Sequence, residues 1–130
     1  MTVTLDHRPR LLLVDDEPTN LQVLRQVLQQ EYRLQFATDG QRALELAREH
    51  TPDLILLDVM MPNLDGYTTL SEIKKNENLN NIKIIFLSAK TGENDIKKGL
   101  DLGADAYMTK PYSIKKLTEK VEELLLYICF

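Results

Sequence analysis

The chain has 130 residues, of which 43% are hydrophobic and 28% are charged, and this composition predicts one globular domain with a sizeable core. Its net charge of −4 argues against a protein whose main task is direct nucleic acid binding. No run approaches the ~20 apolar residues of a membrane span, and residues 1–6 lack the pattern of a signal peptide. Cys129 is the only cysteine, which excludes an internal disulfide; we expect a cytoplasmic protein without a membrane partner.

Two kinds of apolar pattern alternate along the chain after a polar lead-in at residues 1–9, which we expect to be loose. Short apolar runs predict strands, and apolar residues three and four positions apart predict helices. Gly103 suits the left-handed position that closes a helix. The expected strands cover residues 10–14, 34–38, 54–58, 82–87 and 104–108, and the expected helices cover residues 18–30, 43–50, 66–73, 93–102 and 114–125.

The run Leu54 to Leu57 indicates how these elements are arranged. Four consecutive large apolar residues predict a strand buried on both faces, as in a parallel sheet covered by helices. Strands that alternate with helices lead to the same α/β architecture. A closed barrel would need eight such units and about 250 residues, so we expect an open sheet.

Polar residues follow the ends of four expected strands. Because parallel strands end at the same edge of a sheet, one rim should carry the following five side chains. They are Asp15, Asp16, Asp58, Ser88 and Lys110. Three carboxylates on one rim repel one another unless a cation lies between them, and carboxylate oxygens are the ligands that Mg²⁺ takes. A lysine and a serine can hold phosphate oxygens, and a carboxylate can carry a phosphoryl group.

Simpler interpretations of the same residues exist. Asp58 on its own fits a polar residue at the end of a strand, and the acidic stretch Asp15–Glu17 on its own fits a solvated turn before a helix. The convergence of both on one rim favours a metal site.

These residues give the chain a resemblance to the receiver domains of two-component response regulators, from about Arg10 to Leu126. The motifs that carry it are Leu-Val-Asp-Asp-Glu (13–17), Asp-Leu-Ile-Leu-Leu-Asp-Val-Met-Met-Pro (53–62) with Asp-Gly (65–66), Leu-Ser-Ala (87–89) and Gly-Ala-Asp-Ala-Tyr-Met-Thr-Lys-Pro (103–111). The resemblance implies a doubly wound (βα)5 fold with a five-stranded parallel sheet in the order 2-1-3-4-5. It divides the chain into a lead-in (1–9), a receiver domain (10–126) and a C-terminal tail (127–130).

The resemblance also implies a metal site and a phosphoacceptor. Asp58 would accept the phosphoryl group. Mg²⁺ would be held by Asp16, by the Asp58 carboxylate and by the backbone carbonyl of Met60, with Asp15 reaching it through water.

Further roles implied by the resemblance concern the response to phosphorylation. Ser88 and Lys110 would hold the phosphoryl oxygens, and Tyr107 would be the aromatic switch that turns inward when Ser88 moves. The Lys110–Pro111 peptide bond would be cis.

The function implied is a phosphorylation-controlled switch, not an enzyme with an external substrate. A sensor histidine kinase or a phosphotransfer protein would phosphorylate Asp58, and the change would reach the face made by the fourth helix, fifth strand and fifth helix. One alternative is a phosphatase resembling haloacid dehalogenases, which needs a second Asp where Met60 stands. Another is a flavodoxin-like binding module that has lost phosphorylation, against which the intact acidic trio argues.

Two further features leave alternatives open. Ile114, Leu117, Val121, Leu124 and Ile128 predict the buried stripe of the last helix, so part of the remaining apolar C-terminus must face outward. Three interpretations fit these outward-facing residues: a frayed tail, a contact with a second copy of the chain, as in a homodimer, and a contact with a neighbouring domain. Every arginine lies at or before Arg48 and every lysine at or after Lys74, which fits chance drift or a junction of two ancestries.

Overall fold

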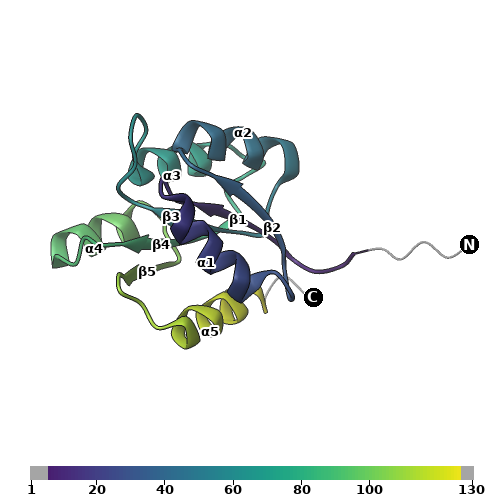
Figure 1. Ribbon diagram of the computed structural model, residues 1–130. Helices are drawn as coiled ribbons and strands as arrows, with labels where there is room; N and C mark the ends of the chain where they lie inside the picture. Colours follow the sequence, from purple (N-terminus) through teal and green to yellow (C-terminus); the bar gives the residue numbers. More distant parts are fainter. Residues whose placement is uncertain (1–5, 127–130) are drawn as a thin grey trace, which may run out of the picture.

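Strand β3 (Leu54–Asp58) lies at the centre of a five-stranded sheet, and all five of its residues are buried, as its apolar run predicts. The computed structural model describes residues 6–126 (Figure 1). The other strands are β1 (Arg10–Val14), β2 (Arg33–Ala37), β4 (Lys83–Ser88) and β5 (Ala106–Thr109). Every neighbouring pair is parallel, and the order β2-β1-β3-β4-β5 confirms the doubly wound fold.

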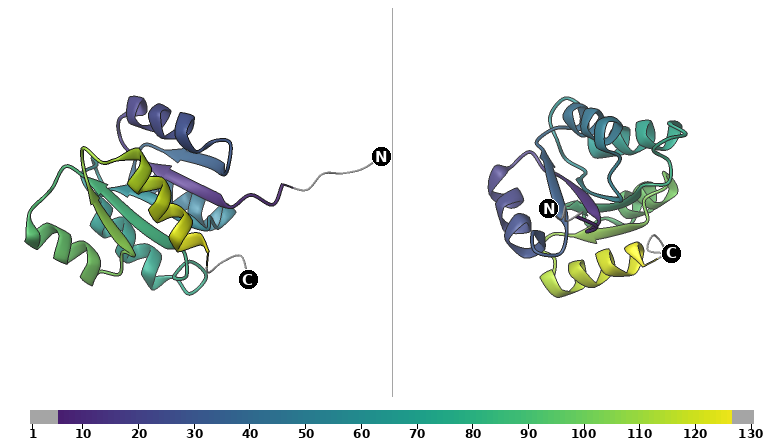
Figure 2. Two further views of the ribbon diagram at one scale, coloured as in Figure 1. Left: turned by 90° about the horizontal axis from the view of Figure 1, so that it is seen from below. Right: turned by 90° about the vertical axis from the view of Figure 1, so that its right-hand side faces the viewer.

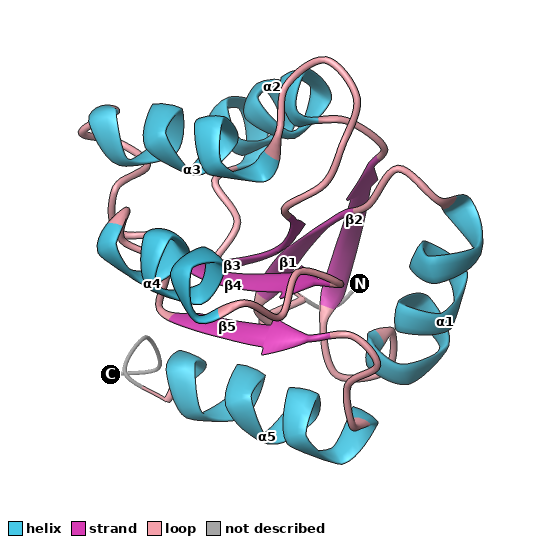
Figure 3. Ribbon diagram, turned by 90° about the vertical axis from the view of Figure 1, so that its left-hand side faces the viewer, coloured by secondary structure: helices cyan, strands magenta, loops and turns pink. Residues whose placement is uncertain are grey.

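Five helices cover the two faces of this sheet. They are α1 (Pro18–Leu28), α2 (Gly40–His50), α3 (Gly66–Lys75), α4 (Glu93–Asp101) and α5 (Ile114–Leu125). The apolar side chains of α1 and α5 pack with one face of the sheet, and those of α2 and α3 pack with the other. Figures 2 and 3 show this layering, with α4 on the same side as α3.

Local sequence signals set the helix starts. Asp39 and Asp65 accept hydrogen bonds from the third backbone N–H of α2 and α3, and Ser113 does the same for α5. Pro18 takes the first position of α1, where a missing N–H costs nothing. Within residues 6–126, no helix combines the length and apolar character that crossing a bilayer requires.

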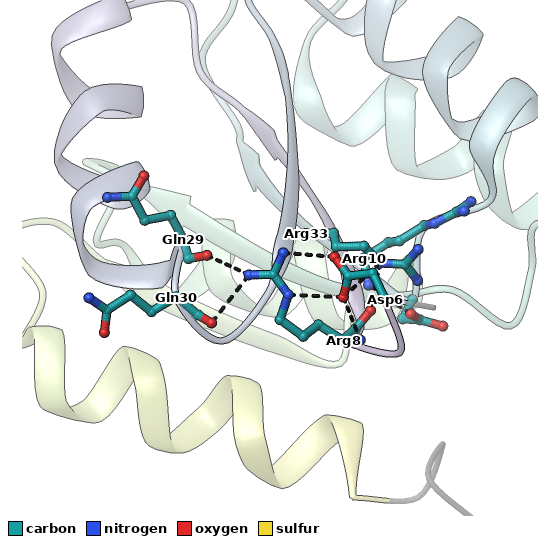
Figure 4. A network of polar contacts seen from close by, with 7 residues as sticks. Asp6, Arg8, Arg10, Gln29, Gln30 and Arg33 are labelled. Carbon is teal, nitrogen blue, oxygen red and sulfur yellow. Dashed lines mark hydrogen bonds and ion pairs between the residues drawn. The ribbon is translucent and has the colours of Figure 1, made fainter. Parts of the chain in front are cut away.

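The lead-in is not loose where the structure describes it, at residues 6–9. Arg8 donates from Nη1 to the backbone carbonyls of Gln29 (2.9 Å) and Gln30 (3.2 Å) at the end of α1 (Figure 4). Arg33 donates to the Arg8 carbonyl at 2.8 Å, and Arg8 pairs with Asp6. Sequence patterns missed this contact because it joins residues more than twenty positions apart. Residues 1–5 lie outside the described residues.

The predicted stripe of the last helix is wrong in part. Ile114 is 49% exposed, whereas Leu125 is only 4% exposed and belongs to the core. The buried positions Leu117, Val121 and Leu125 follow one another at four-residue spacing, which leaves Ile114 on the flank of the helix. The expected tail, residues 127–130, lies outside the described residues.

Strand β2 carries an exposed aromatic side chain, Phe36. The strand lies at the edge of the sheet, so its residues have a neighbouring strand on one side only. The buried residue of β2 is Ala37, which belongs to the core that α2 covers.

Candidate functional site

The carboxyl ends of four strands meet at one rim, and the polar residues expected there are brought together. Asp15 directly follows β1, Asp58 and Ser88 end β3 and β4, and Lys110 directly follows β5. Their alignment follows from the register, in which Asp58 pairs with Leu87 and the next residue of β4, Ser88, pairs with Thr109.

Three carboxylates form a cluster at this rim. One ligand oxygen each of Asp15, Asp16 and Asp58 lies within 4.8 Å of the other two. Asp15 is 4% and Asp58 8% exposed, while Asp16 faces the solvent. Burial of two adjacent like charges is unfavourable without a cation, so the donor set fits a hard divalent ion that prefers oxygen ligands.

Lys110, which lies 52 positions after Asp58 in the sequence, supplies a positive charge to this cluster. Its Nζ lies 3.0 Å from Asp15 Oδ2 and 3.3 Å from Asp58 Oδ2. Burial on its own would lower the pKa of Lys110, but the hydrogen bond with Asp15 and the charges of Asp58 and Asp15 outweigh it and raise that pKa. The lysine therefore stays charged. The Lys110–Pro111 peptide bond is cis.

Asp58 combines a buried carboxylate with an open approach. Burial raises its pKa above the ordinary value, although the Met60 N–H and the Lys110 charge act in the opposite direction. The Met60 N–H donates to Asp58 Oδ1 at 3.1 Å, and the exposed Met60 side chain lies at the edge of the cleft.

The cleft above Asp58 has a volume of about 810 Å³ and extends towards α3 and α4. Tyr67 of α3 lines it and donates from its hydroxyl to the Asp95 carbonyl at 3.1 Å. Lys98 Nζ lies 4.5 Å from the centroid of the Tyr67 ring. Burial raises the pKa of Tyr67 above its ordinary value of 10.0. Its sequence signal was only an aromatic residue after an Asp-Gly pair, and its contacts with α4 were not predicted.

Ser88 and Tyr107 both contact the backbone of Lys90. The Lys90 N–H donates to Ser88 Oγ at 3.0 Å, and the Tyr107 hydroxyl donates to the Lys90 carbonyl at 2.9 Å. Ser88 is fully buried, and the Tyr107 ring packs against Phe86 with their centroids 5.8 Å apart. A displacement of the Lys90 backbone would therefore alter the hydrogen bonds of both side chains.

Asn20 contacts Asp15 and was missed from the sequence. Its amide Nδ2 donates to Asp15 Oδ2 at 3.2 Å. The Glu17 N–H donates to the other carboxylate oxygen, Oδ1, at 2.9 Å. A polar amide in the first turn of α1, five residues after an acidic strand end, is the signal that could have pointed to it.

Known proteins share sequence and structure with this chain. The model of the response regulator receiver domain matches residues 11–122. A probable cyclic di-GMP phosphodiesterase of Vibrio cholerae is 40% identical over 111 residues, which are 85% of this chain and 25% of that protein.

Two solved structures are similar over most of their length. The Francisella response regulator 1452 receiver domain is 34% identical with a TM-score of 0.87, and the match covers 93% of this chain and 99% of that one. The Mn²⁺-bound form of response regulator Rcp1 is 29% identical with a TM-score of 0.75, and the match covers 90% and 91%.

The chain spans from 25% to 52% of the length of the curated relatives compared, so their names describe larger proteins. What matches is the part that carries the acidic rim and the parallel sheet. The chain belongs to the family of response regulator receiver domains.

Proposed function

We propose that this receiver domain accepts a phosphoryl group on Asp58, with Mg²⁺ at the acidic cluster, and passes the change to the face formed by α4, β5 and α5. The observation that carries the proposal is the position of Lys110, whose ammonium bridges the buried carboxylates of Asp15 and Asp58. A cation held beside a buried nucleophile by a second carboxylate is suited to binding the oxygens of an incoming phosphoryl group.

The transfer needs little covalent chemistry from other residues. A carboxylate oxygen of Asp58 attacks the phosphorus of a phosphohistidine, the P–N bond breaks, and the donor imidazole leaves with its electron pair and takes up a proton. Lys110 Nζ turns from the carboxylates to the transferred phosphoryl oxygens and offsets their charge. Reversal of the signal is attack by water on phosphorus, which releases phosphate and restores the Asp58 carboxylate.

Asp15, Asp16, Asp58 and the Met60 carbonyl are the groups that would hold the metal. Mg²⁺ supplies charge neutralisation and orientation of the phosphoryl oxygens when bound. The similarity to a response regulator solved in a Mn²⁺-bound form supports a divalent cation here, and the all-oxygen donor set supports Mg²⁺ as the resident ion.

The response to phosphorylation would begin at Ser88. The Ser88 hydroxyl turns to a phosphoryl oxygen. Because Ser88 Oγ accepts a hydrogen bond from the Lys90 N–H, this rotation displaces the Lys90 backbone. Tyr107 loses its partner at the Lys90 carbonyl when that backbone moves, and its ring can turn inward. The exposed side chain of Leu100 and the hollow between α4 and α5 lie on the face that would change.

The partners and setting follow from this role. A sensor histidine kinase or a phosphotransfer protein is the proposed donor in the cytoplasm, and a homodimer through the α4-β5-α5 face is a proposed output. We assign residues 10–126 to the receiver domain and propose no direct nucleic acid contact by it. A switch fits better than a phosphatase with a general acid, because the Met60 side chain cannot transfer a proton.

Intact mass spectrometry after incubation with acetyl phosphate and Mg²⁺ tests the proposal. One phosphoryl group should appear on the native chain and on Asp65→Asn, whose carboxylate caps α3 and lies outside the cluster. None should appear on Asp58→Asn or when the metal is chelated. Modification of Asp58→Asn at the native rate would exclude Asp58 as the acceptor.

A further inference from the structure

Asn20 occupies a helix position for which asparagine is a poor choice. It is the third residue of α1, and its backbone N–H already donates to the Glu17 carbonyl at 3.1 Å. Asparagine side chains compete with the helical backbone for hydrogen bonds, so alanine or glutamine would favour the helix more. The choice is therefore not explained by the stability of α1.

The side chain of Asn20 is used at the rim instead. It is half-buried at the edge of the cleft, and its amide donates to Asp15 Oδ2, the same oxygen that accepts from Lys110 Nζ. The Glu17 N–H holds Oδ1. The buried carboxylate of Asp15 therefore accepts a hydrogen bond at each oxygen, one from the N-cap residue of α1 and one from its first turn, in addition to the contact with Lys110.

The two hydrogen bonds to Asp15 from Asn20 and Glu17 matter for the phosphotransfer proposed above. When Lys110 turns to the phosphoryl group, Asp15 Oδ2 loses its 3.0 Å ion pair. The Asn20 amide is the neutral donor that stays. Without it, a buried carboxylate would keep a hydrogen bond on Oδ1 only and would be free to rotate away from Asp16 and Asp58.

We propose that Asn20 is a positioning residue that keeps the Asp15 carboxylate directed at the metal site. The inference rests on the proposed Mg²⁺ site and adds a residue to it. Partners that orient metal ligands typically change metal affinity by about 10- to 100-fold when removed. We expect about tenfold here, because the Glu17 N–H still holds Asp15 Oδ1 and, while no phosphoryl group is present, Lys110 still holds Oδ2.

Calorimetric titration with Mg²⁺, without any phosphodonor, measures the effect directly. Asn20→Ala and the shape-preserving Asn20→Leu both lack the amide donor, and each should bind Mg²⁺ about tenfold more weakly than the native chain. Thr19→Ala, an exposed neighbour in the same helical turn, should bind as the native chain does. Thermal melts without Mg²⁺ establish that each variant is folded.

A double-mutant cycle then separates positioning from a general structural effect. If Asn20 acts through Asp15, Asn20→Ala should change Mg²⁺ affinity less than about twofold in an Asp15→Ala background. The Mg²⁺ concentration that half-saturates phosphorylation by acetyl phosphate should rise in Asn20→Ala, with the rate at saturating Mg²⁺ nearly unchanged.

Equal affinity of the native chain and Asn20→Ala would overturn the inference and leave the metal site intact. An equal loss in both Asp15 backgrounds would also overturn it, because the effect would not pass through Asp15. Absence of Mg²⁺ binding by the native chain would refute the proposed metal site itself.

Discussion

Gly66→Ala should disturb the phosphoacceptor through the main chain. Gly66 is the first residue of α3, and its N–H donates to the Val59 carbonyl at 2.9 Å. A Cβ at this position would lie 2.8 Å from Val59 Cα and closer still to the Asp58 carbonyl oxygen. Among the described glycines the left-handed backbone occurs at Gly103 only, so Gly66 is required for close approach and not for its φ angle.

The magnitude follows from the kind of atoms that the methyl group would meet. Overpacking a tight site costs about 1–3 kcal/mol, and we expect about 2 kcal/mol because main-chain atoms cannot rotate away. For a chain of this size about 1 kcal/mol corresponds to about 4 °C in the melting midpoint, so the midpoint should fall by about 8 °C. A misplacement of about 1 Å can slow a reaction about 100-fold, and we expect phosphorylation by acetyl phosphate to slow about tenfold.

Urea unfolding and the initial rate of phosphorylation measure the two effects. Gly92→Ser is the matched control, because the added Cβ meets only the flexible Asp95 carboxylate, at 3.0 Å, and serine is a good N-cap residue for α4. Its free energy of unfolding should stay within about 0.5 kcal/mol of the native value. Native stability together with a native phosphorylation rate in Gly66→Ala would refute the close-packing argument.

Two further substitutions test the charges and the contacts around the cleft. Lys110→Met leaves the carboxylates of Asp15 and Asp58 without a cation and should lower the free energy of unfolding in the absence of Mg²⁺ by about 2 kcal/mol, less than for a fully buried pair because the Lys110 side chain is 25% exposed. Mg²⁺ should raise its melting midpoint more than that of the native chain, and equal Mg²⁺ responses would contradict this role. Tyr67→Phe removes the hydrogen bond to the Asp95 carbonyl and should cost about 1 kcal/mol at pH 8. Since burial raises the pKa of Tyr67 above 10.0, the folded state holds the phenolic proton more tightly, and this contribution is present below about pH 10 and lost as the pH rises further. Urea unfolding at increasing pH should therefore show a steeper loss of stability for the native chain than for Tyr67→Phe, and parallel curves would exclude that contribution.

The alternation of strands and helices was predictable because each element carries its own periodic signal. The central strand β3 is the clearest case. The run Leu54 to Leu57 is incompatible with a solvent-exposed face, and all residues of the strand are buried. Edges were harder to predict. Phe36 is exposed because β2 has a neighbour on one side only, and nothing in its local sequence reports its place in the sheet.

The rim was predictable for a different reason. Parallel strands share one polarity, so residues at their carboxyl ends must meet wherever they lie in the chain. Asp15, Asp58 and Lys110 are brought to within hydrogen-bonding distance on this principle, although 95 positions separate Asp15 from Lys110.

The sequence by itself therefore determined the fold class, the shared edge and the residue types on it, because strand polarity and apolar periodicity are local properties that add up to a topology. Only the tertiary structure decided which side chains touch. The Asn20 amide at Asp15, the Tyr67 hydroxyl at α4 and the Gly66 backbone against Asp58 depend on side-chain direction and helix placement to within about an ångström. Such distances result from the packing of all layers together, which no pattern within one segment encodes.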